Sequence, residues 1–213
     1  MGFCLKVWGD FACFTRPEMK VERVSYEVMT PSAARAIFEA IYWKPQIAWR
    51  ITEIEVLKPI QWINVRRNEL ASGKFVKNAN YRLIEEERQQ KAGLFLYDVA
   101  YRIHGYFDVL QPSENEAKHA SMFHRRAQKG QCVYQPYLGC REFSCHFQLI
   151  ENIENDREYT PAIQITKNLG WMLYDLEFST KDKKETTQPM FFCPMLENGV
   201  VNVPNAQSSE VRK

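Results

Sequence analysis

Glycine is scarce in this chain, and its distribution excludes several classes of enzyme. The 213 residues contain nine glycines, and no two of them lie closer together than seven positions. Phosphate-binding loops and dinucleotide-binding turns need two or three glycines within about six residues, because the backbone must approach the phosphates closely. The sequence therefore predicts neither a P-loop NTPase nor a Rossmann-type dehydrogenase.

Long apolar runs are missing too. No uninterrupted apolar stretch approaches the ~20 residues of a membrane-spanning helix, and Lys6 and Asp10 interrupt the apolar start of the chain. Six cysteines at irregular spacing do not form the framework of a small secreted domain, so we expect reduced thiols. With 45% hydrophobic and 25% charged residues the composition is globular. These features predict a cytoplasmic protein that has no contact with a membrane.

Charge is nearly balanced overall but unevenly distributed. The formal net charge is +2. The stretch 117–141 holds no acidic residue, and the stretch 56–84 holds only one, Glu69. The bases of these two stretches are Lys58, Arg66, Arg67, Lys74, Lys77, Arg82, Lys118, Arg125, Arg126, Lys129 and Arg141. Two basic segments in an otherwise acidic chain indicate an anionic partner that binds at a defined place.

Hydrophobic periodicity predicts six elements in residues 1–150. In chain order they are a strand at 3–8, a helix from 31 to about 43, a strand at 47–56, a strand at 94–107, a helix between a capping box at 113–116 and Gly130, and a strand at 143–150. The order strand, helix, strand, strand, helix, strand is typical of the ferredoxin-like (RRM-like) βαββαβ domain of the α+β class. A basic hairpin is inserted at about 58–86.

The remaining residues, 151–213, predict a β-rich extension. An acidic linker or exposed loop at 151–158 is followed by strand patterns at 170–178 and 190–203, which we expect to form an antiparallel sheet. The polar tail from Pro204 is expected to fray.

Three residues are candidates for catalysis. Lys118 and His119 fall in or near the first turn of the basic helix, where partial positive charge on the backbone favours a bound phosphate. Tyr42 is expected in the last turn of the 31–43 helix, because Pro45 ends that helix. Each residue has an ordinary alternative: solvated basic side chains on a helix face, and a packed tyrosine at the edge of the core.

Metal chemistry receives little support. Cys132, Cys140, Cys145 and His146 lack the paired spacing of zinc ligands, and no carboxylate cluster indicates magnesium. A nuclease built from His, Lys and Tyr would have to cut without a metal. RNA permits this, because its 2′-hydroxyl can attack the adjacent phosphate once a base removes the proton.

A series of motifs identifies a resemblance. The segments are Leu5–Asp10, Phe14–Pro17, Met29–Ala34, Ile41–Pro45, Lys58–Gln61, Lys118–His119, Arg125–Arg126 and Gln135–Phe143. In this order the chain resembles the CRISPR-associated Cas-five family of subtype I-C (Dvulg), within the repeat-associated (RAMP) superfamily, over residues 3 to about 200.

The resemblance implies an endoribonuclease that binds the CRISPR repeat hairpin and its flanking single strand and cleaves the precursor RNA without metal or other cofactor. It implies that the enzyme stays on the 5′ handle of its product with the other type I-C surveillance-complex subunits. The implied catalytic residues are Tyr42, Lys118 and His119, and the expected RNA contacts are Arg16, Arg66, Arg67, Arg125, Arg126 and Arg141. A non-catalytic RNA-binding scaffold and a duplex-DNA-binding CRISPR protein remain alternatives.

Overall fold

The structure is a computed structural model that describes residues 2–19, 21–70, 88–181 and 184–213. Residues 71–87, which include the hairpin bases Lys74, Lys77 and Arg82, lie outside the described residues. The strands are β1 (Gly2–Ala12), β2 (Ile47–Val56), β3 (Gln61–Leu70), β4 (Arg88–Val109), β5 (His146–Leu149), β6 (Lys167–Asn168), β7 (Met172–Lys181), β8 (Lys184–Phe192), β9 (Met195–Glu197) and β10 (Val200–Asn202). The helices are the short η1 (Pro17–Met19), α1 (Pro31–Ile41), α3 (Glu116–Gln128) and α4 (Ile153–Tyr159).

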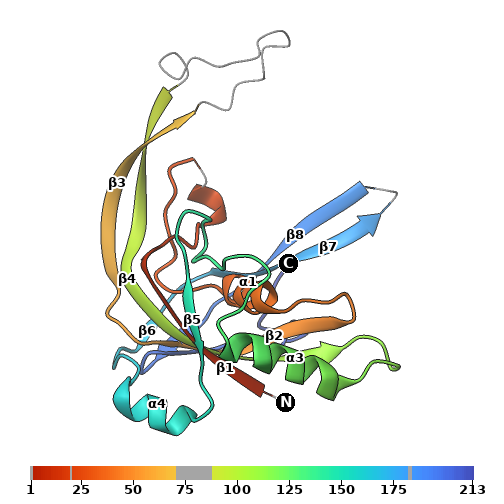
Figure 1. Ribbon diagram of the computed structural model, residues 1–213. Coiled ribbons are helices and arrows are strands. Elements are labelled where there is room, and N and C mark those ends of the chain that lie inside the picture. Colours follow the sequence, from red (N-terminus) through yellow and green to blue (C-terminus); the bar gives the residue numbers. More distant parts are fainter. Residues whose placement is uncertain (1, 20, 71–87, 182–183) are drawn as a thin grey trace.

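A mainly antiparallel sheet forms the centre of the molecule (Figure 1). Neighbouring strands follow the order β5-β1-β4-β2-β10-β9-β6, and β3 pairs with β4. Leu5 of β1 pairs with Ile103 of β4 on one side and with Leu149 of β5 on the other. β10 pairs with β2, so strands of the C-terminal segment continue the same sheet, while β7 and β8 form a separate ribbon. The chain is thus of the α+β class.

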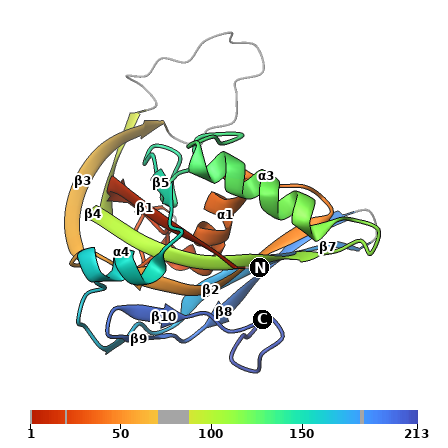
Figure 2. The ribbon, with the colours of Figure 1, turned by 60° about the horizontal axis from the view of Figure 1, so that its bottom comes forward.

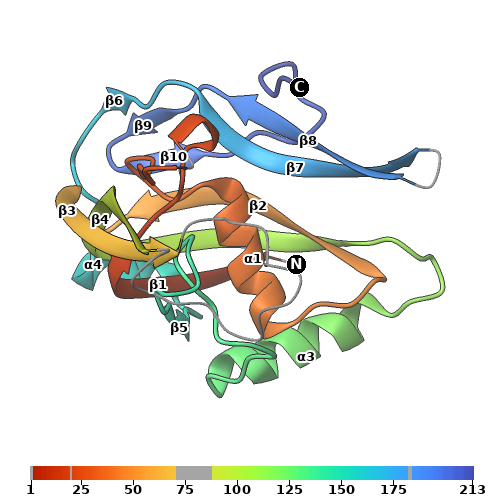
Figure 3. The same cartoon turned by 90° about the horizontal axis from the view of Figure 1, so that it is seen from above.

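Helices α1 and α3 lie together on one face of the sheet (Figures 2 and 3). The alternation in β1 explains this face, because Phe3, Leu5 and Val7 are all buried. The ring of Phe3 lies 4.7 Å from that of Phe123 in α3 and 5.8 Å from that of Trp49 in β2. These alternate residues form the inward face of β1, and the aromatic contacts fix α3 over the sheet.

The first helix begins where the sequence predicts. The Thr30 side chain accepts a hydrogen bond from the N–H of Ala33 at 3.3 Å, and Pro31 is the first helical residue. The helix ends at Ile41, so Tyr42 is the residue after it rather than part of its last turn. The backbone of Tyr42 is extended, at φ −153° and ψ 117°. With this extended backbone the chain leaves the helix at Tyr42.

The basic helix α3 begins later than the capping box predicts. Its cap is Asn115 instead of Ser113, and the Asn115 side chain accepts from the N–H of Lys118 at 3.3 Å. Both residue types can cap a helix, so the pattern alone did not separate them. The end is as predicted, since Gly130 follows the cap residue Lys129 with φ +64°.

The acidic segment predicted as a linker or exposed loop contains a helix, α4, capped by Asn152. An ion-pair cluster holds this helix against the sheet face opposite α1 and α3. Arg102 of β4 is fully buried and donates to Asp156 of α4, to Glu55 of β2 and to the carbonyl oxygen of Thr160. The prediction was wrong because the partner that orders the segment, Arg102, lies far away in the sequence.

The charge state of Glu55 follows from the same cluster. Burial favours the protonated carboxyl, but hydrogen bonds from His104 and Arg157 and the charge of Arg102 outweigh it and hold the pKa of Glu55 at about 2. The carboxylate lies 2.8 Å from Nε2 of His104 and 2.7 Å from Nη2 of Arg157. Glu55 is therefore ionised although its side chain is 2% exposed.

Along the long strand β4, the alternate residues Phe95, Val99, Tyr101 and Ile103 are buried. Tyr97 is the exception and is 44% exposed. The neighbouring Asp98 has φ +50°, which interrupts the regular alternation. The irregularity falls near the end of the pairing with β3, where Tyr97 pairs with Gln61.

The β7–β8 ribbon is held by a side-chain pair to α1 and by a backbone contact with the end of the chain. Arg35 of α1 forms a bidentate pair with Asp175 of β7, with both N–O distances at 2.8 Å. Near the end of the chain, Arg212 exchanges backbone hydrogen bonds with Phe191 of β8 at 2.8 Å. In the part of the chain that the structure describes, none of the helices is both long and apolar enough to cross a membrane.

Candidate active site

Two of the three predicted catalytic side chains meet between α1 and α3. The hydroxyl of Tyr42 lies 2.9 Å from Nδ1 of His119, and both residues are buried, at 2% and 4% exposure. Trp49 fixes the backbone here, because its Nε1–H donates to the Tyr42 carbonyl oxygen at 2.8 Å. Phe107 packs its ring edge-on to the imidazole at 6.2 Å. Residues 77 positions apart are thus held in direct hydrogen-bond contact.

The second ring nitrogen of His119 meets a carboxylate. Nε2 of His119 lies 3.2 Å from Oε2 of Glu114, in the turn that precedes α3. An ionised carboxylate only accepts hydrogen bonds, so Nε2 carries the proton in this arrangement. In the neutral ring Nδ1 is then an acceptor, and the Tyr42 hydroxyl donates to it. Tyr42, His119 and Glu114 form a continuous hydrogen-bonded chain in which every group has its partner.

Arg126 supplies a positive charge beside this chain. Its guanidinium lies over the Tyr42 ring at 5.4 Å, and Nη1 donates to the carbonyl oxygen of Ile41 at 3.1 Å. Burial raises the pKa of Tyr42, and the Arg126 charge opposes that rise. The hydroxyl is therefore protonated at neutral pH, which suits a group that passes a proton on.

Lys118, the third predicted catalytic residue, lies next to the chain in sequence but on the surface. Its backbone N–H closes the Asn115 cap, while its side chain is exposed in the first turn of α3. The ammonium group therefore lies outside the Tyr42–His119 contact and can reach an anion that approaches from solvent. The site thus has a buried hydrogen-bonded pair, Tyr42 and His119, and an exposed cation, Lys118.

The six arginines predicted to contact RNA fall into two groups. Arg66, Arg125 and Arg141 are exposed. Arg16, Arg67 and Arg126 are already engaged within the protein: Arg16 lies over the Tyr26 ring at 4.8 Å, and Arg67 pairs with Glu69 and Glu142. Of the six, Arg126 is the one that contacts Tyr42 directly.

Glu114 is the site residue that the sequence did not single out. It appeared only as a member of the capping box, and its partner His119 is five positions away. Nothing in that spacing distinguishes a carboxylate turned toward the helix from one turned to water. The contact depends on the cap of α3 at Asn115, which places the preceding turn beside the imidazole.

Among the described residues, one group of side chains could share a metal ion, namely Glu53, Glu55 and His104, whose ligand atoms lie within 4.8 Å of one another. Arg157 occupies the space between the two carboxylates, since its Nη2 donates to both at 2.7 Å. A guanidinium in this place competes with a cation. The group therefore fits an ion-pair cluster better than a metal centre.

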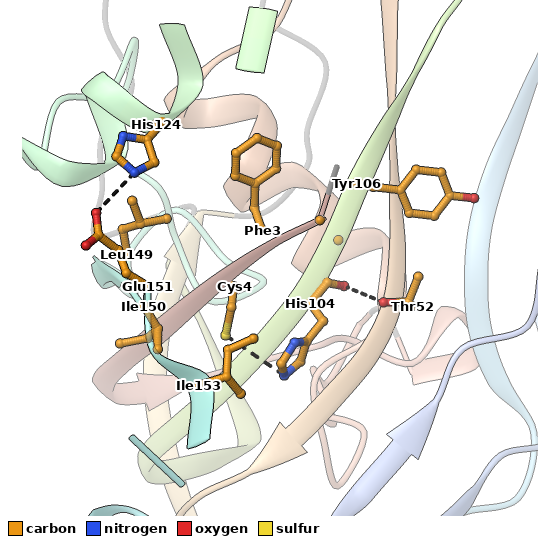
Figure 4. A pocket seen from close by; sticks show the side chains of 12 residues that line it. Phe3, Cys4, Thr52, His104, Tyr106, His124, Leu149, Ile150, Glu151 and Ile153 are labelled. Atoms are coloured by element: carbon orange, nitrogen blue, oxygen red, sulfur yellow. Dashed lines mark hydrogen bonds and ion pairs between the residues drawn. The ribbon is translucent and has the colours of Figure 1, made fainter. Parts of the chain in front are cut away.

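A cavity of about 730 Å³ lies at the start of β1, between the sheet and α4 (Figure 4). Cys4, His104 and Ile153 line it, and the exposed pair His124–Glu151 stands at its side. Burial raises the pKa of the Cys4 thiol to about 12, so the thiol is not a nucleophile at neutral pH. Tyr42, Lys118 and His119 are not among its lining residues, which makes it separate from the candidate site.

The chain is similar to known CRISPR-associated proteins over nearly its whole length. Residues 2–204 match the family Cas_Cas5d, described as CRISPR-associated protein (Cas_Cas5). A relative from Mannheimia succiniciproducens, named CRISPR pre-crRNA endoribonuclease Cas5d, is 46% identical over 98% of this chain and 97% of its own. A relative of the same name from Thermus thermophilus is 38% identical over 97% of this chain and 93% of its own.

Solved structures share the fold. A crystal structure of a CRISPR-associated protein superposes with a TM-score of 0.72 at 24% identity, covering 100% of this chain and 97% of that one. A chain of a CRISPR RNA-guided surveillance complex superposes with a TM-score of 0.54 at 13% identity, covering 97% of this chain and 92% of that one.

Proposed function

The chain belongs to the Cas5d family of CRISPR-associated proteins, and on that premise we propose that it is an endoribonuclease that cuts precursor CRISPR RNA within its repeats. Two relatives that match almost all of the chain are named for this activity. The observation that carries the proposal to particular residues is the 2.9 Å contact between Tyr42 and His119. It joins a tyrosine hydroxyl to an imidazole, two groups that can pass a proton, and the exposed Lys118 directly precedes His119 in the sequence.

The proposed architecture is a ferredoxin-like domain at 1–150 with an extension at 151–213. The elements β1, α1, β2, β4, α3 and β5 follow the βαββαβ order, with the strands arranged as β5-β1-β4-β2. β3 and the start of β4 supply the described part of the inserted hairpin. This arrangement supports the proposed site, because α1 and α3 then bring Tyr42 and His119 together over one face of the sheet.

The proposed reaction is attack of an RNA 2′-hydroxyl on the adjacent phosphorus. The 2′-oxygen forms a bond to phosphorus as its proton leaves, and the bond from phosphorus to the 5′-oxygen breaks as that oxygen takes a proton from solvent water. Tyr42 orients the 2′-hydroxyl, and His119 accepts the proton through the Tyr42 hydroxyl that already donates to Nδ1. Lys118 stabilises the charge on the phosphate oxygens. No step of this reaction requires a metal ion.

RNA recognition is proposed to rest on the basic segments. Arg66, Arg125 and Arg141 present exposed guanidinium groups, which bind phosphate and stack on unpaired bases. Three further arginines already have partners within the protein, namely Arg16, Arg67 and Arg126. They would bind RNA directly after leaving these partners, or support the RNA-binding surface while keeping them. The protein is proposed to bind the repeat hairpin with its flanking single strand and to remain on the 5′ handle. The fold shared with a chain of a surveillance complex supports assembly with other type I-C subunits.

Cleavage of end-labelled cognate repeat RNA in EDTA tests the proposal. We expect the purified chain to cut at one position, and His119→Ala to reduce the single-turnover rate at least about 100-fold with little change in RNA affinity. His124→Ala is the matched control, since His124 lies on the same helix but pairs with Glu151 on the surface. Equal rates for the two variants would contradict the site, and a requirement for metal would contradict the mechanism.

A second candidate function is a non-catalytic RNA-binding scaffold of the same complex. The observation that favours it is the burial of Tyr42 and His119, whose hydrogen bonds are satisfied without any substrate. A scaffold would bind the repeat but leave it uncut under every condition tested above. Binding of duplex DNA is a further alternative, and an affinity for duplex that RNA competitors do not reduce would support it.

A further inference from the structure

We propose that Glu114 is a positioning residue of the cleavage site, which selects the tautomer of His119 and thereby the direction in which Tyr42 passes its proton. The inference rests on the proposed function, because it concerns the same reaction. Its basis is the 3.2 Å contact between Oε2 of Glu114 and Nε2 of His119. Glu114 acts through His119 and has no contact with Tyr42 among the described hydrogen bonds.

The argument starts from the two-sided nature of imidazole. A neutral ring has one donor and one acceptor nitrogen, so fixing one nitrogen fixes the other. With Glu114 accepting from Nε2–H, Nδ1 must accept from the Tyr42 hydroxyl, and a proton can move from tyrosine to the ring. In the opposite tautomer Nδ1–H would donate to the Tyr42 oxygen. The ring could then take no proton from tyrosine, although the atoms would occupy the same positions.

Burial makes the choice of tautomer depend on Glu114. His119 is 4% exposed, so water cannot readily replace a lost partner at Nε2. The other groups that face the ring are the Tyr42 hydroxyl and the ring of Phe107, while Arg126 reaches it only across the Tyr42 ring. Glu114 is the one carboxylate in the described hydrogen bonds of His119, and its side chain is 28% exposed. It bridges the buried ring to the surface.

The same helix carries a control pair. Nε2 of His124 lies 3.1 Å from Oε1 of Glu151, a contact of the same chemistry and nearly the same length. Both side chains are exposed, at 40% and 62%, and none of the described hydrogen bonds or ion pairs connects the pair to Tyr42. If each carboxylate merely stabilised α3 by pairing with a histidine, removing Glu114 and removing Glu151 would change the cleavage rate equally. A positioning role predicts an effect at Glu114 alone.

The test compares Glu114→Ala, Glu114→Asp and Glu151→Ala in the full chain. For each variant we would measure the single-turnover cleavage rate and the RNA dissociation constant. We would also record the ¹⁵N chemical shifts of the His119 ring, which distinguish the two tautomers. Removing a carboxylate that orients a metal-bound histidine typically changes activity about 10- to 100-fold, and Glu114 orients its histidine by the same kind of hydrogen bond. We expect Glu114→Ala to slow cleavage in that range with unchanged affinity and to lose the Nε2–H signature. Glu114→Asp should recover part of both, and Glu151→Ala should match the unaltered chain.

Two results would overturn the inference: an unchanged His119 spectrum in Glu114→Ala, or a loss of rate explained by weaker RNA binding. Circular dichroism and the thermal midpoint identify a variant that fails to fold, and Glu114→Asp then carries the comparison. If the unaltered chain cuts no RNA, the proposed function fails instead. The ring spectrum still decides whether Glu114 selects the tautomer, because it needs no substrate.

Discussion

Replacing Arg102 by Met tests how the sheet and α4 are held together. Arg102 is 0% exposed, and it donates to Glu55, Asp156 and the carbonyl oxygen of Thr160. Met fills a similar volume without charge, so the substitution removes one side of a buried ion-pair cluster and leaves two carboxylates behind. Removing one partner of a buried pair typically costs about 3–5 kcal/mol, because the remaining charge stays desolvated.

The contacts that remain place the expected loss of unfolding free energy at the lower end of that range. Glu55 keeps His104 at 2.8 Å and Arg157 at 2.7 Å, and Asp156 keeps Lys6 at 3.2 Å. We therefore expect Arg102→Met to lower the free energy of unfolding by about 3 kcal/mol. The control is Arg157→Met, whose side chain is 47% exposed and whose loss leaves Glu55 paired with Arg102. It should cost no more than about 1 kcal/mol.

Equilibrium unfolding in urea, followed by far-UV circular dichroism, measures both variants against the unaltered chain. Equal slopes against urea concentration are required, so that the midpoints report the free energy of unfolding. The reasoning is refuted if Arg102→Met is as stable as Arg157→Met, because the buried cluster would then contribute no more than a surface pair. The variant should still cut RNA below its melting range, since the cluster lies on the sheet face opposite the site.

Three further predictions concern the site and the cluster. Tyr42→Phe leaves Nδ1 of His119 without its partner in a buried place, so it should cost about 1–3 kcal/mol of unfolding free energy and abolish rapid cleavage; preserved cleavage would contradict the proton path. Lys118→Ala should slow single-turnover cleavage about 100- to 1,000-fold, because a charge-stabilising group is lost, while stability stays within about 0.5 kcal/mol. The pKa of Glu55 is held at about 2, below its ordinary value of 4.5. Its ionised form should therefore contribute about 3 kcal/mol to the free energy of unfolding above pH 4.5, and this contribution should be lost as the pH falls toward 2. Urea titrations from pH 6 to pH 2 should show this fall in the unaltered chain and a smaller one in Glu55→Gln.

Local signals in the sequence located α1 well and α3 less well. Thr30 and Pro31 define the start of α1 by chemistry that acts within one turn, so the prediction held. Ser113 and Asn115 are both competent caps, and the choice of Asn115 became visible only in the structure. The placement of Tyr42 after the last helical residue, instead of inside the helix, is a shift of one residue at the boundary.

Long-range contacts account for what the sequence did not show. The helix α4 depends on Arg102, and the role proposed for Glu114 depends on a turn packed beside a buried imidazole. Tyr97 is exposed while Phe95 and Val99 are buried, because Asp98 adopts a positive φ, which no periodicity reveals. Tyr42 and His119 were each candidates from local patterns and from the family resemblance. Their direct contact is a product of the fold.

Cleavage of a repeat RNA that carries one 2′-deoxynucleotide at the cut position tests the central claim most directly. The substitution removes the nucleophile and leaves the rest of the RNA intact, so the dissociation constant should hardly change. We predict that the unaltered chain cuts the all-ribose repeat in EDTA and leaves the substituted repeat uncut at that position. Cutting of both RNAs at equal rates would contradict attack by the 2′-hydroxyl and the roles assigned to Tyr42, Lys118 and His119.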